Sequence, residues 1–480
     1  MNFAAEIVDA ADPGRLAMIE LRRDGERREW TFGEVSRAAA GLAGTFRDHG
    51  VGRGDVVVTV IGNRAEWVLA MMACFRLGAV VLPCTEQLRS KDLRLRFEAA
   101  GPALIVADRR DLDEVEGARD GLPLVVVPDD DLFAADPAPA ADLKSEDPCL
   151  ITFTSGTSGQ PKGVLHCQRY LTGQGLQATE WLTAGEGELV WCTAASGWSK
   201  SARNVFIAPW LRGATALLHD ARFDPEERLE IVEREGVAVL CMAPTEYRVI
   251  AKRAQLRPLP RLRTMVAAGE ALDPDTLRTW RDATGVEIRD GYGQTETGQV
   301  TAIPLGEVKP GSMGLPLPGV SAWTDDDGEL VLDPRTVPTF FRGYLGEEPW
   351  DRATPWHTGD RVRQDADGYL FYEGRNDDVI VSAGYRIGPF EVESALMSHP
   401  AVAEAAAVAA PDEERGSVVR AIVVLTAEGE ASDQLRAELQ EHVKAQTAPY
   451  KYPRILEFAE TLPRTDSGKL RRSALRLSRI

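Results

Sequence analysis

The 480-residue sequence lacks several features that would have placed it in a narrower class of protein. Its six cysteines form no C-x-x-C pair, so neither a disulfide framework nor a thiolate metal site is indicated. It has no excess of positive charge, because 74 acidic and 55 basic residues give a net charge of -19. This balance argues against long-range attraction to nucleic acid or to anionic membranes.

The sequence also lacks a long apolar run and a signal peptide. Its most apolar run, from Trp67 to Phe75, is followed by Arg76 and is too short to span a bilayer, so we expect a buried helix there. The first residues, MNFAAEIVDAADPGR, have neither a basic start nor an apolar core. With cysteines that read as reduced, these absences predict a cytoplasmic protein with no membrane partner.

What the chain does contain is an alternation of short β-branched runs and helical segments. Runs such as 55–62, 103–108 and 237–244 alternate with segments of helical spacing at 66–77 and 225–235, which is typical of an α/β fold with buried parallel strands. Residues 128–148 are rich in Pro, Ala and Asp and indicate a surface connector. At this length we expect more than one domain.

The sequence pattern changes after about residue 311, where short strand-like runs and hairpin signals begin. Asp327-Gly328 between two short apolar runs predicts a hairpin. The last segment predicts an α+β unit, with helices at 391–398 and 432–446 and a strand at 420–425.

Residues 151–166, ITFTSGTSGQPKGVLH, follow an apolar run and combine glycines, hydroxyls and one lysine. Backbone N–H groups, the hydroxyls and the charge of Lys162 suit the binding of phosphate groups. The segment does not fit the Walker pattern, because the chain has Pro161 and Gly163 where that pattern needs glycine and a hydroxyl. A flexible linker is the alternative, but a linker has little use for the Pro-Lys-Gly ending.

Four further motifs follow in a fixed order: DGYGQTETG from Asp290, WHTGD ending at Asp360, GRNDDVIVSAGYRIGPFEVE from Gly374, and PRTDSGKLRR around Lys469. The first follows a strand-like run, so its residues are expected at the carboxyl end of a strand, where ligands bind in open α/β sheets. Taken singly, each motif also suits a surface turn, a helix cap, a solvated charge run or a basic tail. The occurrence of all four motifs in this order indicates that they contribute to one active site.

With these motifs the chain resembles the adenylate-forming superfamily of acyl-CoA synthetases, amino-acid adenylation domains and luciferases, and is closest to acyl-CoA synthetases of the acetyl and medium-chain type. The phrases AGEALDPD, GYGQTETG, SAGYRIGPFEVES and APYKYPR carry the likeness to the medium-chain branch. The resemblance implies a large N-terminal AMP-binding domain of several subdomains, residues 1–376. A small mobile α+β domain, residues 377–480, would carry the catalytic lysine and hinge at Asp377.

The resemblance also implies that ATP first converts a carboxylic acid into an acyl adenylate, with Mg²⁺ as a cofactor. The catalytic residues would be Lys469, Thr295 and Glu296, and Glu296 would also hold the metal. The ATP and AMP contacts would come from the loop (Thr154, Ser155, Gly156, Thr157, Lys162), from the adenine segments (Gly269, Glu270, Ala271, Asp290, Gly291, Tyr292) and from the ribose pair (Asp360, Arg375). A cation aimed at the α-phosphate suits this step, because negative charge gathers there.

A second step would pass the acyl group to coenzyme A after rotation about Asp377, with Gly384, Tyr385 and Arg386 contacting CoA. The acyl pocket would include Trp198 and Gly293, because acetate-activating relatives carry a tryptophan at the position of Gly293. A pocket opened by glycine would favour a medium-chain or aryl acid, since each buried methylene contributes about 0.8 kcal/mol. Lys200 lies near this pocket in the sequence but equally suits solvent.

The sequence therefore predicts an AMP-forming acyl-CoA synthetase of fatty acid metabolism whose partner is a small carboxylic acid, with no nucleic acid. A homodimer is compatible with it. One alternative is an acyl-AMP ligase that loads a separate carrier protein. Another is a non-catalytic nucleotide-binding scaffold, which the joint presence of Lys469, Glu296 and Asp377 disfavours.

Overall fold

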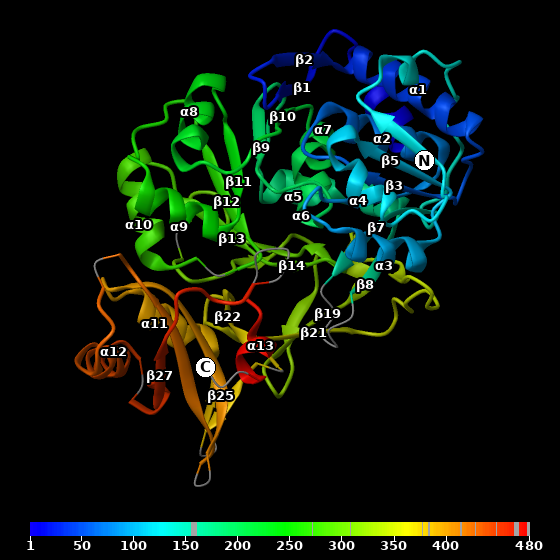
Figure 1. Cartoon of the computed structure of the whole chain (residues 1–480). Coiled ribbons are helices and arrows are strands. Elements are labelled where there is room, and N and C mark those ends of the chain that lie inside the picture. Colours follow the sequence, from blue (N-terminus) through cyan, green and yellow to red (C-terminus); the bar gives the residue numbers. More distant parts are fainter. Residues whose placement is uncertain are drawn as a thin grey trace.

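The computed structural model describes residues 1–154, 161–270, 272–307, 309–376, 378–382, 385–412, 415–427, 429–447, 449–464 and 470–477. Two large sheets make up most of the chain, and a third sheet and a small C-terminal unit lie below them in Figure 1. The predicted α/β fold with a large N-terminal and a small C-terminal part is confirmed.

The first large sheet has seven strands and contains most of the parallel strands that follow residue 180. In spatial order they are β13 (Ile288–Gly291), β12 (Thr264–Ala268), β11 (Val239–Met242), β9 (Leu189–Cys192), β10 (Thr215–His219), β1 (Leu16–Leu21) and β2 (Arg27–Thr31). Only β2 is antiparallel to its neighbour.

The second large sheet contains the two strands that flank the expected phosphate loop. Its order is β20 (Gly343–Tyr344), β8 (Lys162–Cys167), β7 (Pro148–Thr154), β4 (Val80–Cys84), β3 (Val56–Val60), β5 (Leu104–Asp108) and β6 (Leu124–Val127). Strands β7 and β8 form an antiparallel hairpin around that loop, with Thr154 opposite Lys162.

Both sheets are covered by helices on each face, which explains the apolar character of their strands. Val239 and Cys241 face a large core cluster between the sheets, whereas Leu240 and Met242 face a second cluster on the outer side. The helices of this part are α1 (Phe32–Asp48), α2 (Ala65–Leu77), α3 (Ser90–Ala100), α4 (Leu112–Glu116), α5 (Gln168–Glu180), α6 (Lys200–Ala202), α7 (Ala208–Leu211), α8 (Pro225–Glu235), α9 (Pro244–Arg253) and α10 (Pro274–Thr284). Figure 1 shows α5 and α7 between the two sheets, with α8, α9 and α10 on the outer face of the first.

Helix α2 is the apolar run that the sequence singled out. Every residue from Trp67 to Phe75 is fully buried in the central cluster, which confirms the expected buried helix. The helix ends at Gly78, whose φ of 73° is the left-handed conformation that a glycine cap supplies. Short helical turns occur as η1 (Ala4–Asp9), η2 (Arg109–Asp111), η3 (Asp130–Phe133), η4 (Arg203–Ile207), η5 (Pro334–Thr336) and η6 (Pro449–Lys451), of which η1 and η4 are π-helical. The predicted connector at 128–148 contains η3 and is otherwise irregular up to β7.

Short antiparallel strands follow β13. These are β14 (Gly293–Gln294), β15 (Gly298–Gln299), β16 (Thr301–Ala302), β17 (Leu315–Pro316), and a four-stranded sheet of β18 (Ala322–Thr324), β19 (Glu329–Leu332), β21 (Trp356–Gln364) and β22 (Leu370–Arg375). The predicted hairpin at Asp327-Gly328 joins β18 to β19.

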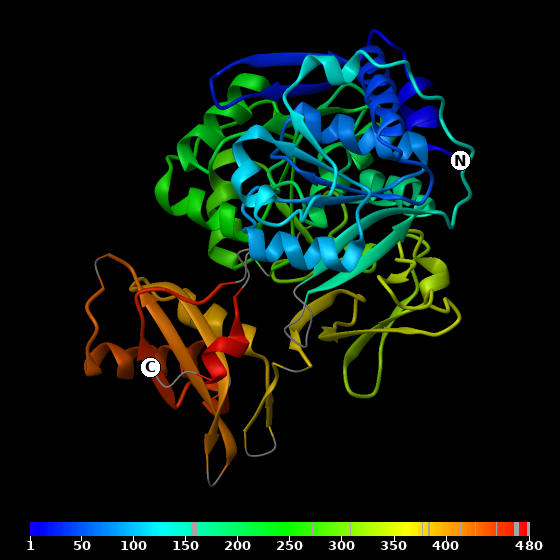
Figure 2. The ribbon, with the colours of Figure 1, turned by 45° about the vertical axis from the view of Figure 1, so that its right-hand side comes forward.

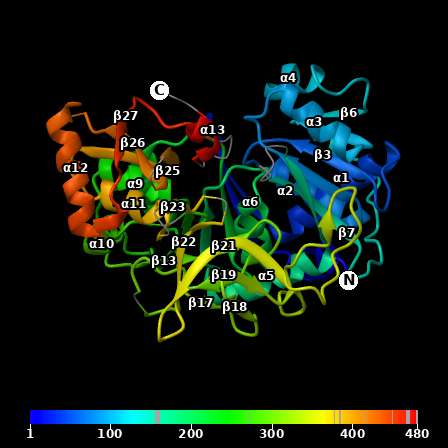
Figure 3. The same ribbon diagram turned by 90° about the horizontal axis from the view of Figure 1, so that it is seen from below.

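The C-terminal unit has hydrophobic clusters of its own, made only of residues from Ile380 onwards. It contains β23 (Ile380–Ser382), β24 (Tyr385–Ile387), α11 (Pro389–Met397), β25 (Val402–Asp412), β26 (Gly416–Leu425), α12 (Asp433–Gln446), β27 (Ile455–Phe458) and α13 (Arg472–Leu477). Figures 2 and 3 show this orange and red unit as a separate body beside β21 and β22. Within the described part of the chain, no helix combines the length and apolarity needed to cross a bilayer.

Candidate functional site

The expected adenine segments begin where two neighbouring parallel strands end. Strands β12 and β13 pair in register, with Ala268 opposite Gly291. Gly269 follows β12 directly, and Asp290 and Gly291 close β13. The chain therefore places these residues side by side at the carboxyl edge of the sheet, as the sequence predicts.

Lys200 reaches this edge from helix α6. Its Nζ donates to the carbonyl oxygen of Ala268 at 3.0 Å, and a Cβ added to Gly269 would lie 3.0 Å from the same Nζ. Gly269 has a φ of 99°, which a larger residue adopts only with strain. The lysine therefore points inward, and the alternative of a solvent-facing side chain is wrong.

Asp290 is a carboxyl group held partly out of water. Burial raises its pKa to about 8, while the Gly291 amide and the charge of Lys200 oppose the shift. The amide of Gly291 donates to its Oδ1 at 2.8 Å. At neutral pH the folded protein therefore keeps Asp290 mostly protonated, which makes it a hydrogen-bond donor as well as an acceptor.

Glu270 lies next to the same edge, but its side chain is held by helix α9. Its Oε2 accepts from Thr245 Oγ1 at 2.8 Å and from Arg248 Nη2 at 2.9 Å. The backbone of Glu270 remains the part of the residue that fits the predicted adenine contact.

Asp360 collects donors from two separate parts of the chain. The Tyr292 hydroxyl and Gln294 Nε2 (2.7 Å) donate to its Oδ2, and Arg375 Nη1 lies 3.4 Å from its Oδ1. Gln294 and Arg375 also donate to the carbonyl oxygen of Thr358, at 2.7 and 3.1 Å. Asp360 is 5 % exposed; burial raises its pKa, and Arg375 opposes that shift.

This cluster joins the predicted adenine residue Tyr292 to the predicted ribose pair Asp360 and Arg375, which are direct partners across β21 and β22. Gln294 was not among the residues predicted for the site. Its only sequence signal was its position within the QTET phrase, and its two contacts depend on how β21 folds back on the hairpin.

A second cluster lies between the end of the phosphate loop and Glu296. The ammonium of Lys162 lies 4.7 Å from the ring centre of Tyr344, and the Tyr344 hydroxyl donates to Glu296 Oε1 at 3.0 Å. Burial, and next the charge of Glu296, raise the pKa of Tyr344. Tyr344 was missed from the sequence because it lies in no motif. Thr295, the neighbour of Glu296, is half-buried.

Gly293, predicted to open the acyl pocket, lies in a tight hairpin. It pairs with Gln299 in the β14–β15 hairpin, and an added Cβ would overlap the carbonyl oxygen of Gly298. The glycine allows two backbones to approach closely, and its place in the acyl pocket stays a prediction.

Trp198, the other predicted pocket residue, is half-buried in a loop that both sheets hold in place. Ser196 in this loop donates to the carbonyl oxygen of Ile61, and Asn63 Nδ2 donates to Ala194 O at 3.1 Å. These contacts fix the chain just before Lys200.

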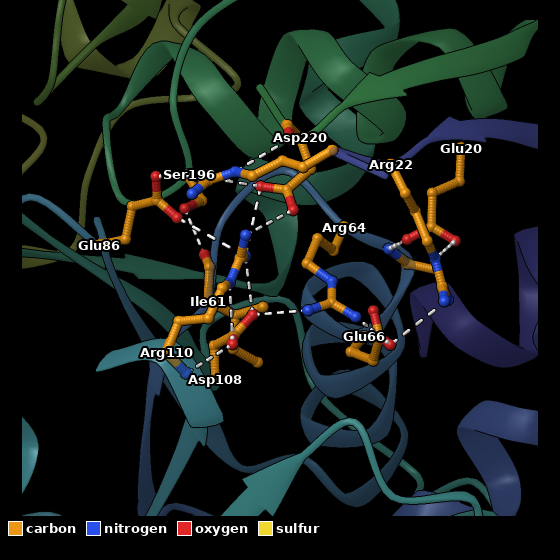
Figure 4. A network of polar contacts seen from close by, with 12 residues as sticks. Glu20, Arg22, Ile61, Arg64, Glu66, Glu86, Asp108, Arg110, Ser196 and Asp220 are labelled. Carbon is orange, nitrogen blue, oxygen red and sulfur yellow. Dashed lines mark hydrogen bonds and ion pairs between the residues drawn. The ribbon is translucent and has the colours of Figure 1, made fainter. Parts of the chain in front are cut away.

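The loop contacts belong to a network of charged residues at the junction of the two sheets (Figure 4). Arg110 Nη1 lies 3.0 Å from Asp220, and Arg110 also donates to Asp108 at 2.8 and 3.0 Å. Arg64 continues the chain of ion pairs from Asp108 (2.7 Å) to Glu66 (2.9 Å). Since Asp220 follows β10 and Asp108 ends β5, the network links the two sheets beside the site.

Tyr385, predicted to contact CoA, is 51 % exposed and stacks on Tyr450 with ring centres 4.3 Å apart. Arg386 lies in β24 opposite Val381. The remaining predicted residues lie outside the described ones: Ser155, Gly156, Thr157, Ala271, Asp377, Gly384 and Lys469.

Comparison with known proteins places this geometry in a family. Residues 6–344 match the family model described as AMP-binding enzyme, and residues 391–469 match the AMP-binding enzyme C-terminal domain. The human mitochondrial acyl-coenzyme A synthetase ACSM4 is 38% identical over 523 residues, which cover 99% of this chain and 90% of that protein. The uncharacterized acyl-CoA ligase YtcI of Bacillus subtilis (strain 168) is 37% identical over 490 residues, covering 96% and 93% of the two chains. A benzoate CoA ligase from Burkholderia xenovorans LB400 superposes with a TM-score of 0.89 at 27% identity, covering 99% of this chain and 100% of that one.

Proposed function

The chain belongs to the family of AMP-binding enzymes, and we propose that it is an AMP-forming acyl-CoA synthetase that activates a carboxylic acid with ATP and passes the acyl group to CoA. The observation that carries this proposal is the meeting of Tyr292, Gln294 and Arg375 on the buried carboxylate of Asp360. Such a fixed acceptor is suited to the hydroxyl groups of a ribose.

A carboxylate reacts poorly with nucleophiles because it is negatively charged and its oxide is a bad leaving group. In the first step an oxygen of the acid attacks the α-phosphorus of ATP, and pyrophosphate leaves. In the second step the CoA thiolate attacks the acyl carbon, and AMP leaves with the oxygen that came from the acid. The protein has to position the reactants and offset negative charge in both steps.

The phosphate groups would lie between the hairpin of β7 and β8 and the segment that carries Glu296. Lys162 supplies a cation there, and Tyr344 holds the Glu296 carboxylate from the opposite side. A single carboxylate suits Mg²⁺, which prefers to keep water and substrate oxygens in its coordination shell. When bound, the ion would offset the charge of the phosphates.

The adenine ring would lie at the carboxyl edge of β12 and β13, against the backbone from Gly269 to Glu270 and beside Tyr292. Asp290, mostly protonated at neutral pH, offers both a donor and an acceptor at this edge. Lys200 lies between these strands and the loop of Trp198, so the reacting acid would enter from that side.

The second step requires the C-terminal unit to present CoA to the same adenylate. We assign Lys469 to the first step and the segment around Tyr385 and Arg386 to the second, with rotation about Asp377 between them. An acyl-AMP ligase that loads a carrier protein would share the first step and differ only in the acceptor.

The proposal is tested with a panel of carboxylic acids scored for pyrophosphate release, with and without CoA. A synthetase releases pyrophosphate continuously only when CoA is present, because the adenylate otherwise stays bound. Release that CoA does not accelerate for any acid would favour the carrier-protein ligase, and no acid-dependent release would contradict the proposal. A homodimer, a cytoplasmic location and a role in fatty acid metabolism stay predictions of the sequence.

A further inference from the structure

Five arginines of the described chain are buried, and one of them differs from the others. The other four each have a carboxylate or carbonyl partner: Arg64 pairs with Asp108 at 2.7 Å, Arg228 lies 3.6 Å from Glu246, Arg420 lies 2.6 Å from Glu457, and Arg289 donates to the carbonyl oxygens of Ile303 (2.8 Å), Trp181 (2.9 Å) and Glu180 (2.5 Å). Arg64 and Arg228 each keep an unpaired Nε in addition to these contacts. Arg203 has no such partner.

Arg203 is 3 % exposed, and two of its three side-chain nitrogens, Nε and Nη1, have no hydrogen-bond partner. Among the described residues no carboxylate forms an ion pair with it. A buried guanidinium cannot lose its proton, so its charge has to be compensated or tolerated at a cost in stability. It opens the π-helical turn η4, and such turns occur frequently at functional sites.

The groups around Arg203 are also buried and unsatisfied. Neither ring nitrogen of His166 and neither amide atom of Gln174 has a hydrogen-bond partner, and Asn204 Nδ2 lacks one too. The phenol of Tyr170 lies beside Arg203 and Gln174. Burial, and next the charge of Arg203, lower the pKa of His166 to about 3, so this ring is neutral and does not compete for an anion. Buried polar groups are rarely left unpaired unless a ligand or ordered water completes them.

Two contacts connect this unsatisfied cluster with the proposed reaction site. Arg203 is one helical turn after Lys200, which contacts Ala268 at the adenine edge. On its other side Arg203 neighbours His166, and the backbone of Thr295, next to Glu296, is close enough to oppose the lowering of the His166 pKa, although the contact does not reach hydrogen-bond geometry. Arg203 therefore has one sequence neighbour at the adenine edge, Lys200, and one spatial neighbour, His166, near the segment of Glu296.

We infer that the acid which this enzyme activates carries a second carboxylate, and that Arg203 is the residue that binds it. The inference rests on the proposed function and narrows its substrate class. A carboxylate oxygen that accepts from Nη1 of Arg203 would offset the buried charge and satisfy one of its two free nitrogens, and the neutral amides and imidazole beside it offer further hydrogen-bonding groups. It differs from the sequence-based expectation of a medium-chain or aryl acid, for which an apolar pocket is suited.

The test compares straight-chain acids of equal carbon number that differ only in the second carboxylate: succinate with butyrate, glutarate with valerate, and adipate with hexanoate. Pyrophosphate release with CoA gives kcat/KM for each acid. For at least one chain length, kcat/KM for the dicarboxylate should exceed kcat/KM for the matching monocarboxylate by at least about tenfold. In Arg203→Met, kcat/KM for the dicarboxylate should fall by at least about thirtyfold, because the loss of one partner of a buried charge pair weakens binding strongly. In the same variant, kcat/KM for the monocarboxylate should change by less than about threefold. Arg203→Lys, which keeps a cation, should restore part of the preference.

Thermal unfolding separates this role from a structural one. Arg203→Met should leave the Tm unchanged or raise it, because it removes an uncompensated buried charge. The matched control is Arg289→Met, which should lower the Tm because three carbonyls lose their donor. Adding the preferred dicarboxylate should raise the Tm of the wild type and not that of Arg203→Met.

Three results would overturn the inference while leaving the proposed function intact: faster turnover of the monocarboxylate at every length, turnover confined to acids outside both series, or a Tm loss in Arg203→Met as large as in Arg289→Met. No pyrophosphate release with any carboxylic acid would instead remove the proposed function itself.

Discussion

Tyr292 donates its hydroxyl to Asp360, and this contact ties the segment after β13 to strand β21 across 68 residues of chain. The two residues come from motifs that the sequence could only place in order. Their contact brings two separate motifs together at the proposed nucleotide site, with Gln294 and Arg375 as further donors to the same carboxylate.

Tyr292→Phe should weaken ATP binding by about tenfold, because a hydrogen bond to a charged group contributes roughly 1.5–3 kcal/mol and the other two donors remain. Isothermal titration calorimetry with ATP gives the change in Kd. Tyr369→Phe is the control, since the Tyr369 hydroxyl bonds to Glu307, away from the site. Equal Kd values for Tyr292→Phe and wild type would mean that this contact does not shape the nucleotide site.

Asp290 should make the stability of the protein depend on pH. Its pKa rises from 3.8 in the unfolded chain to about 8 in the fold. Between these values the folded state holds a proton that the unfolded state has released, so stability falls as the pH rises through this window. Asp290→Asn removes the effect.

The Tm of Asp290→Asn minus that of the wild type should therefore increase from pH 5 to pH 8 and level off above it. Differential scanning calorimetry of both proteins at several pH values measures the difference. A constant difference over the whole range would show that Asp290 is ionised in the folded protein.

Gly293→Ala should lower the Tm and the activity on every acid together, because the new Cβ would overlap the Gly298 carbonyl. Gly175 is the matched control: it lies inside helix α5, and a Cβ there would meet nothing within 4 Å. Gly175→Ala should stabilise the protein by about 1 kcal/mol through helix propensity. A changed acid preference with an unchanged Tm in Gly293→Ala would show instead that Gly293 borders the acyl pocket.

Lys469→Ala should slow formation of the acyl adenylate by at least about a hundredfold, the usual loss for one donor that acts in the transition state. Thioester formation from a supplied acyl adenylate should change little, since Lys469 is assigned to the first step alone. Rapid-quench measurement of each half-reaction provides the comparison. A similar decrease in the rates of both half-reactions would contradict the assignment of Lys469 to the first step alone.

The sequence predicted the parts of the fold that depend on local patterns. Helix α8 begins and ends at the predicted residues, because Pro225 starts it and Gly236 stops it with a φ of 72°. The buried helix α2 and the hairpin at Asp327-Gly328 follow from an apolar run and a turn dipeptide in the same way.

The missed features depend on contacts between distant segments. The direction of Lys200 is decided by Ala268, 68 residues later, and the role of Gly293 by the approach of the Gly298 backbone. Tyr344 belongs to no motif, and its role comes from pairing of β20 with β8. Arg203 looks in the sequence like any helical arginine, and only its burial without a carboxylate sets it apart.

The central claim is that the acid attacks the α-phosphorus of ATP, and labelled oxygen tests it most directly. The enzyme is supplied with its acid carrying ¹⁸O in both carboxylate positions, with ATP and CoA, and the products are examined by mass spectrometry. The account predicts one ¹⁸O atom in AMP and one in the thioester carbonyl. Label in inorganic phosphate, or AMP free of label, would show that the acid is activated in another way and would contradict the account.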